Sequence, residues 1–394
     1  MPRIPSMATI LFITDLISGS RRPPLAGVRE AAAERGWHVE EVELARLEEP
    51  LESVLAYWQP VGCIVEGSGT HHPTPAALRT MPVVWLDPPA EILADPAAAT
   101  LVNDNIAIAD LAFEALTATG ASAYAFVGWS RRVRWSCARE DRFTARLKAL
   151  GKPCRVLADP WTLGNKADFA TRLRPFLRAL PRPCAIFAAN DDFASVILDF
   201  CKMDGIRVPG ELYVVGVDDD PSVCDYTTPS LTSIRPNFTQ AGRRAVQLLA
   251  ARLDAAAAHP PVKATSAHET YAPLGVTRRL STRQVAASDG GIGAALDLIR
   301  REACNGLKAA DVVKALGVSE RLAETRFKAA TGRRITEEIT DVRFERVLEL
   351  LANPKQSLSA IANLCGWGSS IYLERLFKRR TGRSMRDWRK AHAS

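Results

Sequence analysis

Residues 310–332 read ADVVKALGVSERLAETRFKAATG, and a related stretch, LSAIANLCGWGSSIYLERLFKRRTG, follows at 358–382. Equivalent residues recur at an offset of 49 to 50 positions: Gly317 and Gly366, Phe327 and Phe377, Gly332 and Gly382. Each copy has two short segments of helical apolar spacing, a turn containing glycine between them, and a glycine stop. Two helices joined in this way form a helix-turn-helix. The repeat therefore predicts two such units, and a tandem pair implies DNA as the partner.

The apolar positions of the repeat predict which side chains are buried. In the first helix of the two copies they are Val312, Val313, Leu316, Ile361 and Leu364. In the second helix they are Leu322 or Ala323 with Phe327, and then Leu373 with Leu376 and Phe377. The opposite faces of these second helices are therefore expected to meet the partner.

This segment resembles the double helix-turn-helix domain of AraC/XylS-type transcription regulators. The resemblance rests on four motifs: RFKAATGRR at 326–334, EEITDVRFERVLELLAN at 337–353, SLSAIANLCGW at 357–367 and YLERLFKRRTGRS at 372–384. The chain departs from the family at Trp367-Gly368, where Phe-Ser is usual, at Ala323 in place of leucine, and at Met385, where proline is common. The resemblance implies an all-α DNA-binding domain.

Helical geometry then predicts the side chains that face DNA. Those expected at base edges are Ser319, which we also expect to cap its helix, Glu320, Arg321, Glu324 and Thr325, and in the second unit Ser369, Ser370, Glu374 and Arg375. Arginine reads guanine with two N–H donors, and Ser, Thr and Glu accept or donate to several bases. Those expected at phosphates are Lys328, Lys378, Arg379 and Arg380. For any one of them a solvated surface position is the alternative. A connecting helix over 335–351, about 25 Å long, would place the two reading helices roughly one DNA turn apart.

The distribution of charge agrees with this reading. Residues 292–394 hold 20 of the 51 Lys and Arg but 12 of the 44 Asp and Glu, so their net charge is +8 and that of the rest is −1. The basic excess of the whole chain, +7, therefore lies where a polyanion would bind.

Cysteines, histidines and apolar runs limit the other classes of function. The eight cysteines form no C-x-x-C pair and the six histidines stand at no zinc-ligand spacing, so we expect reduced thiols, no cofactor and no structural metal. The apolar run at 8–13 is too short for a signal peptide, and no run reaches the 18 residues or so of a membrane span. These features predict a cytoplasmic protein with no membrane partner.

The first 280 residues alternate short apolar runs with helical segments. The expected strands are 8–13, 39–42, 61–65, 81–86, 124–128, 155–157, 185–188 and 213–217, and the expected helices include 25–36, 51–60, 107–119, 139–150, 168–180 and 193–204. Such alternation is typical of parallel sheets covered by helices. Two series of this length predict two doubly wound lobes with a ligand cleft at the carboxyl ends of their strands.

Several motifs in this part resemble the sensor domains of LacI/GalR regulators, which share the fold of periplasmic sugar-binding proteins. They are PVVWLD at 82–87, VNDN at 102–105, AYAFVG at 123–128, AIFAANDDFA at 185–194, GIRVPGELYVVGVDDDP at 205–221 and TTPSLTSIRPNFTQAGRRAVQLL at 227–249. A sensor of this type in front of an AraC-type domain is similar to the xylose-responsive regulators of bacteria. We therefore expect a sensor over 1–280, a linker over 281–291 and the DNA-binding domain over 292–394.

The resemblance implies particular ligand contacts in the sensor. Arg139 in RxxRF, Asn190 in the AAND turn and Asp218 after VVGV match the family's sugar-contacting residues. Guanidinium, amide and carboxylate groups suit vicinal hydroxyls. The alternative for each is a role in a turn or a helix cap, and Asp218 to Asp220 could instead hold a metal.

Two further residues are candidates from their position alone. Trp135 lies one turn before Arg139 and could stack on a sugar ring, although a tryptophan is more often part of the core. Trp129 and Trp161 are weaker candidates of the same kind. Asp15, after the first strand, is a possible polar contact.

These observations predict a sugar-responsive, sequence-specific transcription regulator, an activator of a pentose catabolic operon by its resemblance to the xylose-responsive group. The expected partners are an operator in double-stranded DNA, a small sugar, a second copy of the chain and, for an activator, RNA polymerase. One alternative is a constitutive DNA-binding regulator whose degenerate sensor only dimerises. The other is a sugar-processing enzyme, but no nucleophile, base and orienting group occur together as a set.

Overall fold

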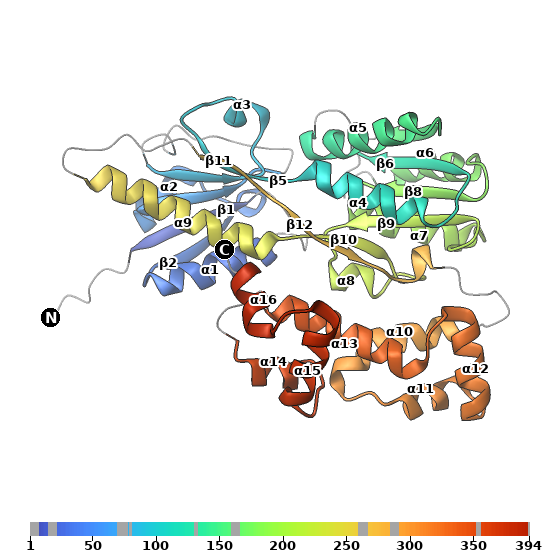
Figure 1. The fold of residues 1–394 in the computed structure, drawn as a ribbon. Coiled ribbons are helices and arrows are strands. Elements are labelled where there is room, and N and C mark those ends of the chain that lie inside the picture. Colours follow the sequence, from blue (N-terminus) through green and yellow to red (C-terminus); the bar gives the residue numbers. More distant parts are fainter. Residues whose placement is uncertain are drawn as a thin grey trace. The chain divides into compact units, whose positions relative to one another are not determined.

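The computed structural model describes residues 8–14, 22–68, 78, 81–129, 133–158, 166–258, 267–283, 291–351 and 356–392. The chain divides into two compact units, residues 1–283 and 284–394. The first is an α/β unit with two sheets and the second is entirely helical (Figure 1).

The first sheet of the α/β unit has the strand order β11-β5-β4-β3-β1-β2 and is parallel throughout. Its strands are β1 (Thr9–Thr14), β2 (His38–Glu43), β3 (Gly62–Glu66), β4 (Val83–Leu86), β5 (Ala99–Asn103) and β11 (Ala267–Tyr271). Helices α1 (Arg22–Glu34) and α9 (Phe238–Ala257) share one core with this sheet, and α2 (Leu51–Trp58) shares another. Because both faces are covered, β1 and β3 are continuous apolar runs rather than alternating ones. We call this part lobe 1.

The second sheet has the order β12-β10-β9-β8-β6-β7, parallel except for the pair β10 and β12. Its strands are β6 (Ala123–Gly128), β7 (Cys154–Ala158), β8 (Cys184–Ala188), β9 (Leu212–Val217), β10 (Thr232–Pro236) and β12 (Pro273–Thr277). Its helices are α4 (Asn105–Thr117), α5 (Arg134–Ala149), α6 (Lys166–Arg178), α7 (Asp191–Met203) and α8 (Pro221–Cys224). This part is lobe 2, and the two lobes confirm the predicted pair of doubly wound sheets.

The chain passes between the lobes three times, from β5 to α4, from β10 to α9 and from β11 to β12. Helix α9 and the edge strand β11 of lobe 1 therefore come after most of lobe 2 in the sequence. Helix α9 lies against α1, and two glycines permit the close approach. A Cβ on Gly27 would lie 2.0 Å from the Thr239 carbonyl oxygen, and one on Gly242 would lie 2.1 Å from that of Pro24.

The helical unit contains α10 (Ile292–Glu302), α11 (Ala309–Leu316), α12 (Glu320–Thr331), α13 (Ile335–Leu351), α14 (Leu358–Leu364), α15 (Ser370–Thr381) and α16 (Met385–His392). The pairs α11–α12 and α14–α15 are the two predicted helix-turn-helix units, joined by α13. The turns place Gly317 and Gly366 at φ +66° and +71°, in the left-handed region where glycine is least strained.

The sequence repeat is also a repeat of hydrogen bonds. Thr331 donates its hydroxyl to the Phe327 carbonyl at 2.7 Å, and Thr381 donates to that of Phe377 at 2.9 Å. Both hydroxyls accept from an arginine backbone N–H two residues later. Helices α12 and α15 therefore end with the same geometry.

Most of the predicted core of the repeat is buried, although Val313 and Leu316 are only half-buried. Of the two alternatives for the second helix, Ala323 is the buried one, since Leu322 is 40% exposed. The prediction for Leu364 is wrong, because this last residue of α14 is 54% exposed. Cys365 and Trp367, in the turn that follows, are buried beside Ile361 instead.

Replacing Gly242 with alanine should lower the free energy of unfolding of the α/β unit by about 1–3 kcal/mol, because the added methyl forces α1 and α9 apart. Urea titration followed by circular dichroism measures this change. Ala26→Ser, on the exposed face of α1, is the control and should have almost no effect. Equal stability of Gly242→Ala and the wild type would show that the two helices are not closely packed.

Candidate functional sites

Arg139 is the centre of the candidate ligand site in the α/β unit. It lies within α5, which begins five residues earlier than the sequence predicts. Its side chain is 3% exposed. The Nε atom donates to Asn105 Oδ1 at 2.9 Å, and one terminal nitrogen donates to the Ala189 carbonyl at 2.5 Å. Arg139 thereby joins α5 to the start of α4 and to the end of β8.

Charges around Arg139 compensate for its burial. Desolvation lowers the pKa of its guanidinium, whereas Asp218 and then Asp87 raise it. Burial and Asp191 raise the pKa of Asp218 well above the ordinary value of 3.8, and Arg139 opposes this rise. Asp218 also has φ +114°, an unusual backbone conformation for a residue with a side chain. Strain of this kind is characteristic of functional positions, where the surrounding structure holds it in place.

The three consecutive aspartates after β9 have different partners. Asp219 is paired with Arg279 at 2.6 Å and accepts the Thr277 hydroxyl at 2.5 Å. Asp220 accepts the Ser222 backbone N–H at 2.8 Å and so caps α8. Asp218 accepts no hydrogen bond on its carboxylate from the described residues, which leaves this group available to a ligand.

Asn190 is the N-cap of α7. Its side-chain oxygen accepts the Phe193 backbone N–H at 3.0 Å. The capping alternative raised by the sequence is therefore present in the structure. Its amide nitrogen makes no hydrogen bond within the described part of the chain, so the cap and a ligand contact are compatible.

Trp135 has two partners in the structure, and its predicted role as a ring that stacks on sugar stays a prediction. The Arg139 guanidinium lies 4.7 Å from the centre of its ring, and its indole N–H donates to the Ser68 carbonyl at 3.1 Å. This hydrogen bond joins α5 of lobe 2 to the end of β3 in lobe 1. Asp15 and Trp161, two of the other candidates, lie outside the described residues.

Sequence reasoning missed Asp87 and Tyr271, which meet where the chain crosses between the lobes. The Tyr271 hydroxyl donates to Asp87 Oδ2 at 2.6 Å, and the Asn103 backbone N–H donates to Oδ1 at 2.7 Å. Burial raises the pKa of Asp87, and these two hydrogen bonds and Arg139 oppose the rise. Like Asp218, Asp87 directly follows a buried strand and has a positive φ, here +45°. That position after a strand was the signal available in the sequence.

Asp191 is a buried carboxylate beside the site. It accepts from the Ser233 hydroxyl at 2.6 Å, the Asp220 backbone N–H at 3.0 Å and the Cys224 thiol at 3.1 Å. Gly216 makes room for it, because a Cβ there would lie 2.2 Å from Asp191 Oδ1. Desolvation raises the pKa of Asp191 despite these donors.

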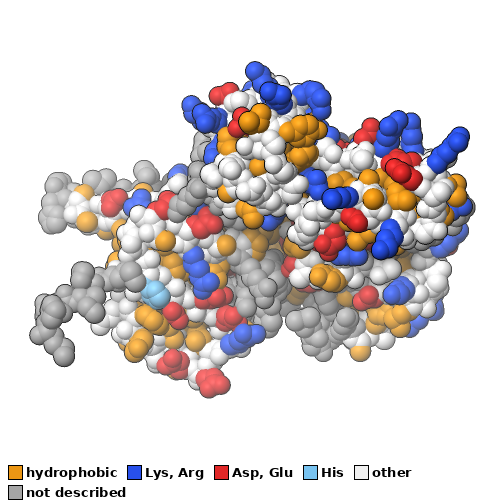
Figure 2. Space-filling model, turned by 90° about the horizontal axis from the view of Figure 1, so that it is seen from below, with side chains coloured by type: hydrophobic (Ala, Val, Ile, Leu, Met, Phe, Trp, Pro, Cys, Tyr) orange, Lys and Arg blue, Asp and Glu red, His pale blue; other side chains and the backbone are white. Residues whose placement is uncertain are grey.

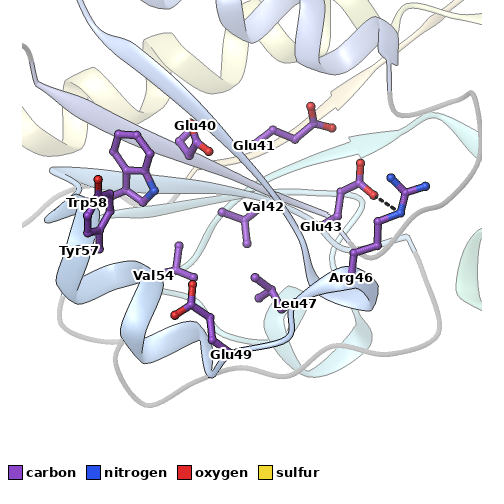
Figure 3. Close-up of a pocket in the computed structure, with 10 residues that line it drawn as sticks. All are labelled: Glu40, Glu41, Val42, Glu43, Arg46, Leu47, Glu49, Val54, Tyr57 and Trp58. Atoms are coloured by element: carbon purple, nitrogen blue, oxygen red, sulfur yellow. Dashed lines mark ion pairs between the residues drawn. The ribbon is translucent and has the colours of Figure 1, made fainter.

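A separate surface pocket of about 390 Å³ lies on the outer edge of lobe 1 (Figure 3). Strand β2, helix α2 and the segment between them form its walls, and Glu43 and Arg46 are ion-paired there at 3.0 Å. It contains none of the predicted ligand-binding residues. Among the described residues no group of three His, Cys, Asp or Glu could hold a metal ion. Within the same part of the chain, no helix has the length and apolarity needed to cross a membrane.

On α12 the predicted DNA-facing residues lie at the surface. Ser319, Glu320, Arg321, Thr325 and Lys328 are exposed and Glu324 is half-buried. Ser319 occupies the N-cap position, but its side chain makes no capping hydrogen bond. The Thr325 hydroxyl donates to the Arg321 carbonyl at 2.7 Å.

On α15 the predicted residues Ser369, Glu374, Arg375, Lys378 and Arg379 are exposed, and Ser370 is half-buried. Ser369 caps the helix by accepting the Tyr372 backbone N–H at 3.4 Å. The sequence reading missed Ile371 and Tyr372, which are 65% and 55% exposed on this helix.

Arg380 differs from the other Lys and Arg side chains of helix α15. It is paired with Asp341 of α13 at 2.7 Å and lies over the Phe344 ring. Arg333, after the first recognition helix, pairs with the same carboxylate. Arg380 therefore helps to hold the helical unit together, and its expected role at phosphates stays a prediction. Many other Lys and Arg side chains stand out on the face shown in Figure 2.

Comparison with known proteins agrees with both halves of this description. Residues 113–282 match the family described as a periplasmic binding protein-like domain, and residues 312–391 match a helix-turn-helix domain. A sensor-type α/β unit followed by two helix-turn-helix units defines a DNA-binding transcription regulator. In this organisation the chain is similar to AraC-type regulators that carry a LacI/GalR-like sensor.

The similar proteins are named as regulators. The xylose operon regulatory protein of Escherichia coli (strain K12) is 29% identical over 73% of each chain, and that of Haemophilus influenzae is 28% identical over 71% of each. The solved structure of the xylose-binding transcription activator XylR has the same fold, with a TM-score of 0.58, 24% identity and coverage of 99% of this chain and 100% of that chain. The complex of the regulator CelR with cellobiose matches 71% of this chain and 86% of that chain, with a TM-score of 0.57 and 19% identity.

Arg321→Ala and Arg375→Ala should each weaken binding to the specific operator by about 1–3 kcal/mol while leaving binding to random DNA nearly unchanged, because each removes a contact to a base edge. Lys378→Ala is the comparison. As a phosphate contact it should weaken binding to both DNAs and reduce the slope of affinity against salt by about one. Fluorescence anisotropy at several salt concentrations measures all three variants. Equal losses on both DNAs for Arg321→Ala or Arg375→Ala would place that arginine at a phosphate instead.

Proposed function

We propose that this chain is a sugar-responsive activator of a pentose catabolic operon and that its ligand is a monosaccharide similar to xylose. The observation that carries the proposal is the buried Arg139 with Asp218 as its strongest charge partner, where Asp218 is held at φ +114° and its carboxylate accepts no hydrogen bond from the described residues. The names of the relatives, xylose operon regulatory proteins, support the pentose class.

The chemistry of the site suits a neutral polyol. Arg139 offers its remaining N–H donors, Asn190 an amide nitrogen, and Asp218 two acceptor oxygens. A sugar hydroxyl both donates and accepts, so neighbouring hydroxyls can satisfy donors and an acceptor at once. The guanidinium and the carboxylate largely balance each other in charge, which favours an uncharged sugar over a sugar phosphate.

The proposed response couples the sensor to DNA in a homodimer. Sugar binding would favour one arrangement of the two lobes, because a ligand shifts an equilibrium through its difference in affinity for the two states. The dimer would bring the DNA-binding units of its two copies to an operator, and an activator would then act on RNA polymerase. The oligomeric state and the direction of regulation are part of the proposal.

Isothermal titration of the full chain with a panel of pentoses and hexoses tests the sensor directly. DNA binding is then measured with and without the sugar that binds, on the promoter region next to a pentose catabolic operon. A saturable interaction with one pentose and a change in DNA affinity are expected. Absence of binding to every sugar, with intact DNA binding, would instead identify a constitutive regulator whose sensor only dimerises.

Asp218→Asn should weaken sugar binding by about tenfold to a hundredfold, because charge-assisted hydrogen bonds typically contribute about 1.5–3 kcal/mol. Asparagine tolerates the positive φ better than other residues do, so the fold is kept. DNA affinity without sugar should stay unchanged, and the sugar effect on DNA binding should shift to higher sugar concentration. Asp199→Asn, on the exposed face of α7, is the matched control. Sugar affinity equal to the wild type would remove Asp218 from the site.

Sugar affinity should also depend on pH through Asp218. Because burial raises its pKa well above 3.8, the carboxylate is protonated at a higher pH than an exposed aspartate, and a protonated carboxyl accepts hydrogen bonds less well. Affinity should therefore rise as pH increases through this raised pKa and become constant above it. The rise should be absent in Asp218→Asn, which separates it from any contribution of Asp191 or Asp87. A flat wild-type profile in titrations from pH 4 to 8 would contradict this role.

A further inference from the structure

Three buried polar atoms beside the candidate ligand site have no partner within the described protein. They are the indole Nε1 of Trp129, the Nε of Arg134 and the Oδ1 of Asn103. Folded proteins satisfy nearly all buried polar atoms, because leaving one unpaired costs more than an average hydrogen bond contributes. Three such atoms in one neighbourhood indicate that something other than the described residues pairs with them.

The three residues lie on separate elements, and two of them act on Asp87, which is a charge partner of Arg139. Trp129 follows β6, whose neighbour in the sheet is β8, so Trp129 lies beside the strand end that carries Asn190. Arg134 opens α5, and its charge acts on Asp87. Asn103 ends β5 and donates its backbone N–H to that same Asp87. Trp129 and Asn103 stand at the carboxyl ends of β6 in lobe 2 and β5 in lobe 1.

The position of Trp129 is fixed by its surroundings. Its backbone N–H donates to Ser136 Oγ at 3.1 Å, and its ring meets Phe193 edge-on with the ring centres 6.1 Å apart. Gly128 leaves room for Ser136, because a Cβ on Gly128 would lie 2.7 Å from Ser136 Oγ. The unpaired indole N–H therefore belongs to a held side chain rather than to one free to seek another partner.

Trp129 also differs from Trp135 in what it has left to offer. The Trp135 N–H is used by the Ser68 carbonyl, and one face of its ring is close to Arg139. Of the two tryptophans, only Trp129 retains its donor. Arg134 stands in the first turn of a helix, where the helix dipole disfavours a cation, so its position needs a reason outside the helix.

We propose that the sugar site extends from Arg139 and Asp218 to Trp129, Arg134 and Asn103, and that Trp129 contacts the ligand through its indole N–H rather than by stacking. The two unpaired N–H groups donate to hydroxyl or ring oxygens of a neutral monosaccharide, and the Asn103 amide oxygen accepts from a hydroxyl. This inference rests on the proposed function, and it adds donors from lobe 2 and an acceptor from lobe 1, so that one ligand holds both lobes.

Trp129→Phe and Asn103→Leu in the full chain test the proposal, because Trp129→Phe removes the unpaired indole N–H and Asn103→Leu replaces the unpaired amide oxygen with an apolar group of similar shape. If the atoms bind sugar, each variant should lose about tenfold or more in sugar affinity. The thermal stability of ligand-free Asn103→Leu should be unchanged or higher, since a buried unpaired group has been replaced by an apolar one of similar size. Trp367→Phe is the matched control: its Nε1 is also buried and unpaired, but it lies in the DNA-binding unit.

A series of monodeoxy sugars then locates the contact. In the wild type, removing the hydroxyl that meets Trp129 should weaken binding by about tenfold, whereas in Trp129→Phe the same deoxy sugar should bind as well as the parent sugar. Wild-type affinity for sugar in both variants would overturn the extended site, with ordered water as the partner of these atoms. If Trp129→Phe lost affinity equally for the parent sugar and for every deoxy sugar, and also had lower thermal stability, the role of Trp129 would be structural. That result would also overturn the extended site. Failure of the wild type to bind any sugar would instead remove the proposed function, and this inference with it.

Discussion

The burial of one positive charge constrains much of lobe 2. Removing a guanidinium from water is costly, and this cost is recovered only if hydrogen bonds and an opposite charge are in place. Arg139 obtains them from four elements: Asn105 at the start of α4, the carbonyl after β8, the ring of Trp135 in α5, and Asp218 after β9. These elements must therefore take one arrangement, and that arrangement sets the strand ends at which a ligand can bind.

The neighbouring aspartates show how one short sequence divides structural and functional tasks. Asp219 is ion-paired with Arg279, and Asp220 caps α8. These two interactions hold the turn that follows β9. Asp218 is thereby held in a backbone conformation that its own preference does not favour. Strain at Asp218 is tolerated because the residues around it are firmly bonded, and the result is a carboxylate whose position is set before any ligand arrives.

Local patterns allowed the repeat and the two doubly wound sheets to be predicted, because helix periods, glycine turns and buried apolar strands are written in neighbouring residues. The same logic placed Asp218 and Asn190 at strand ends. The hydrogen bonds of Tyr271 with Asp87 and of Trp135 with Ser68 join residues 184 and 67 positions apart. The local sequence around one residue of such a pair does not predict its partner. The error at Leu364 has a related cause, since the period of a short helix does not show where tertiary packing stops.

The three crossings between the lobes also set an order of events during synthesis. The first helix made, α1, covers its sheet together with α9, which begins at Phe238, and the outer strand of that sheet ends at Tyr271. Strands β6 to β10 of lobe 2 all leave the ribosome before either piece is available. The lobe whose synthesis begins first thus waits for most of lobe 2 before its own core can form, because more than two hundred residues separate α1 from α9.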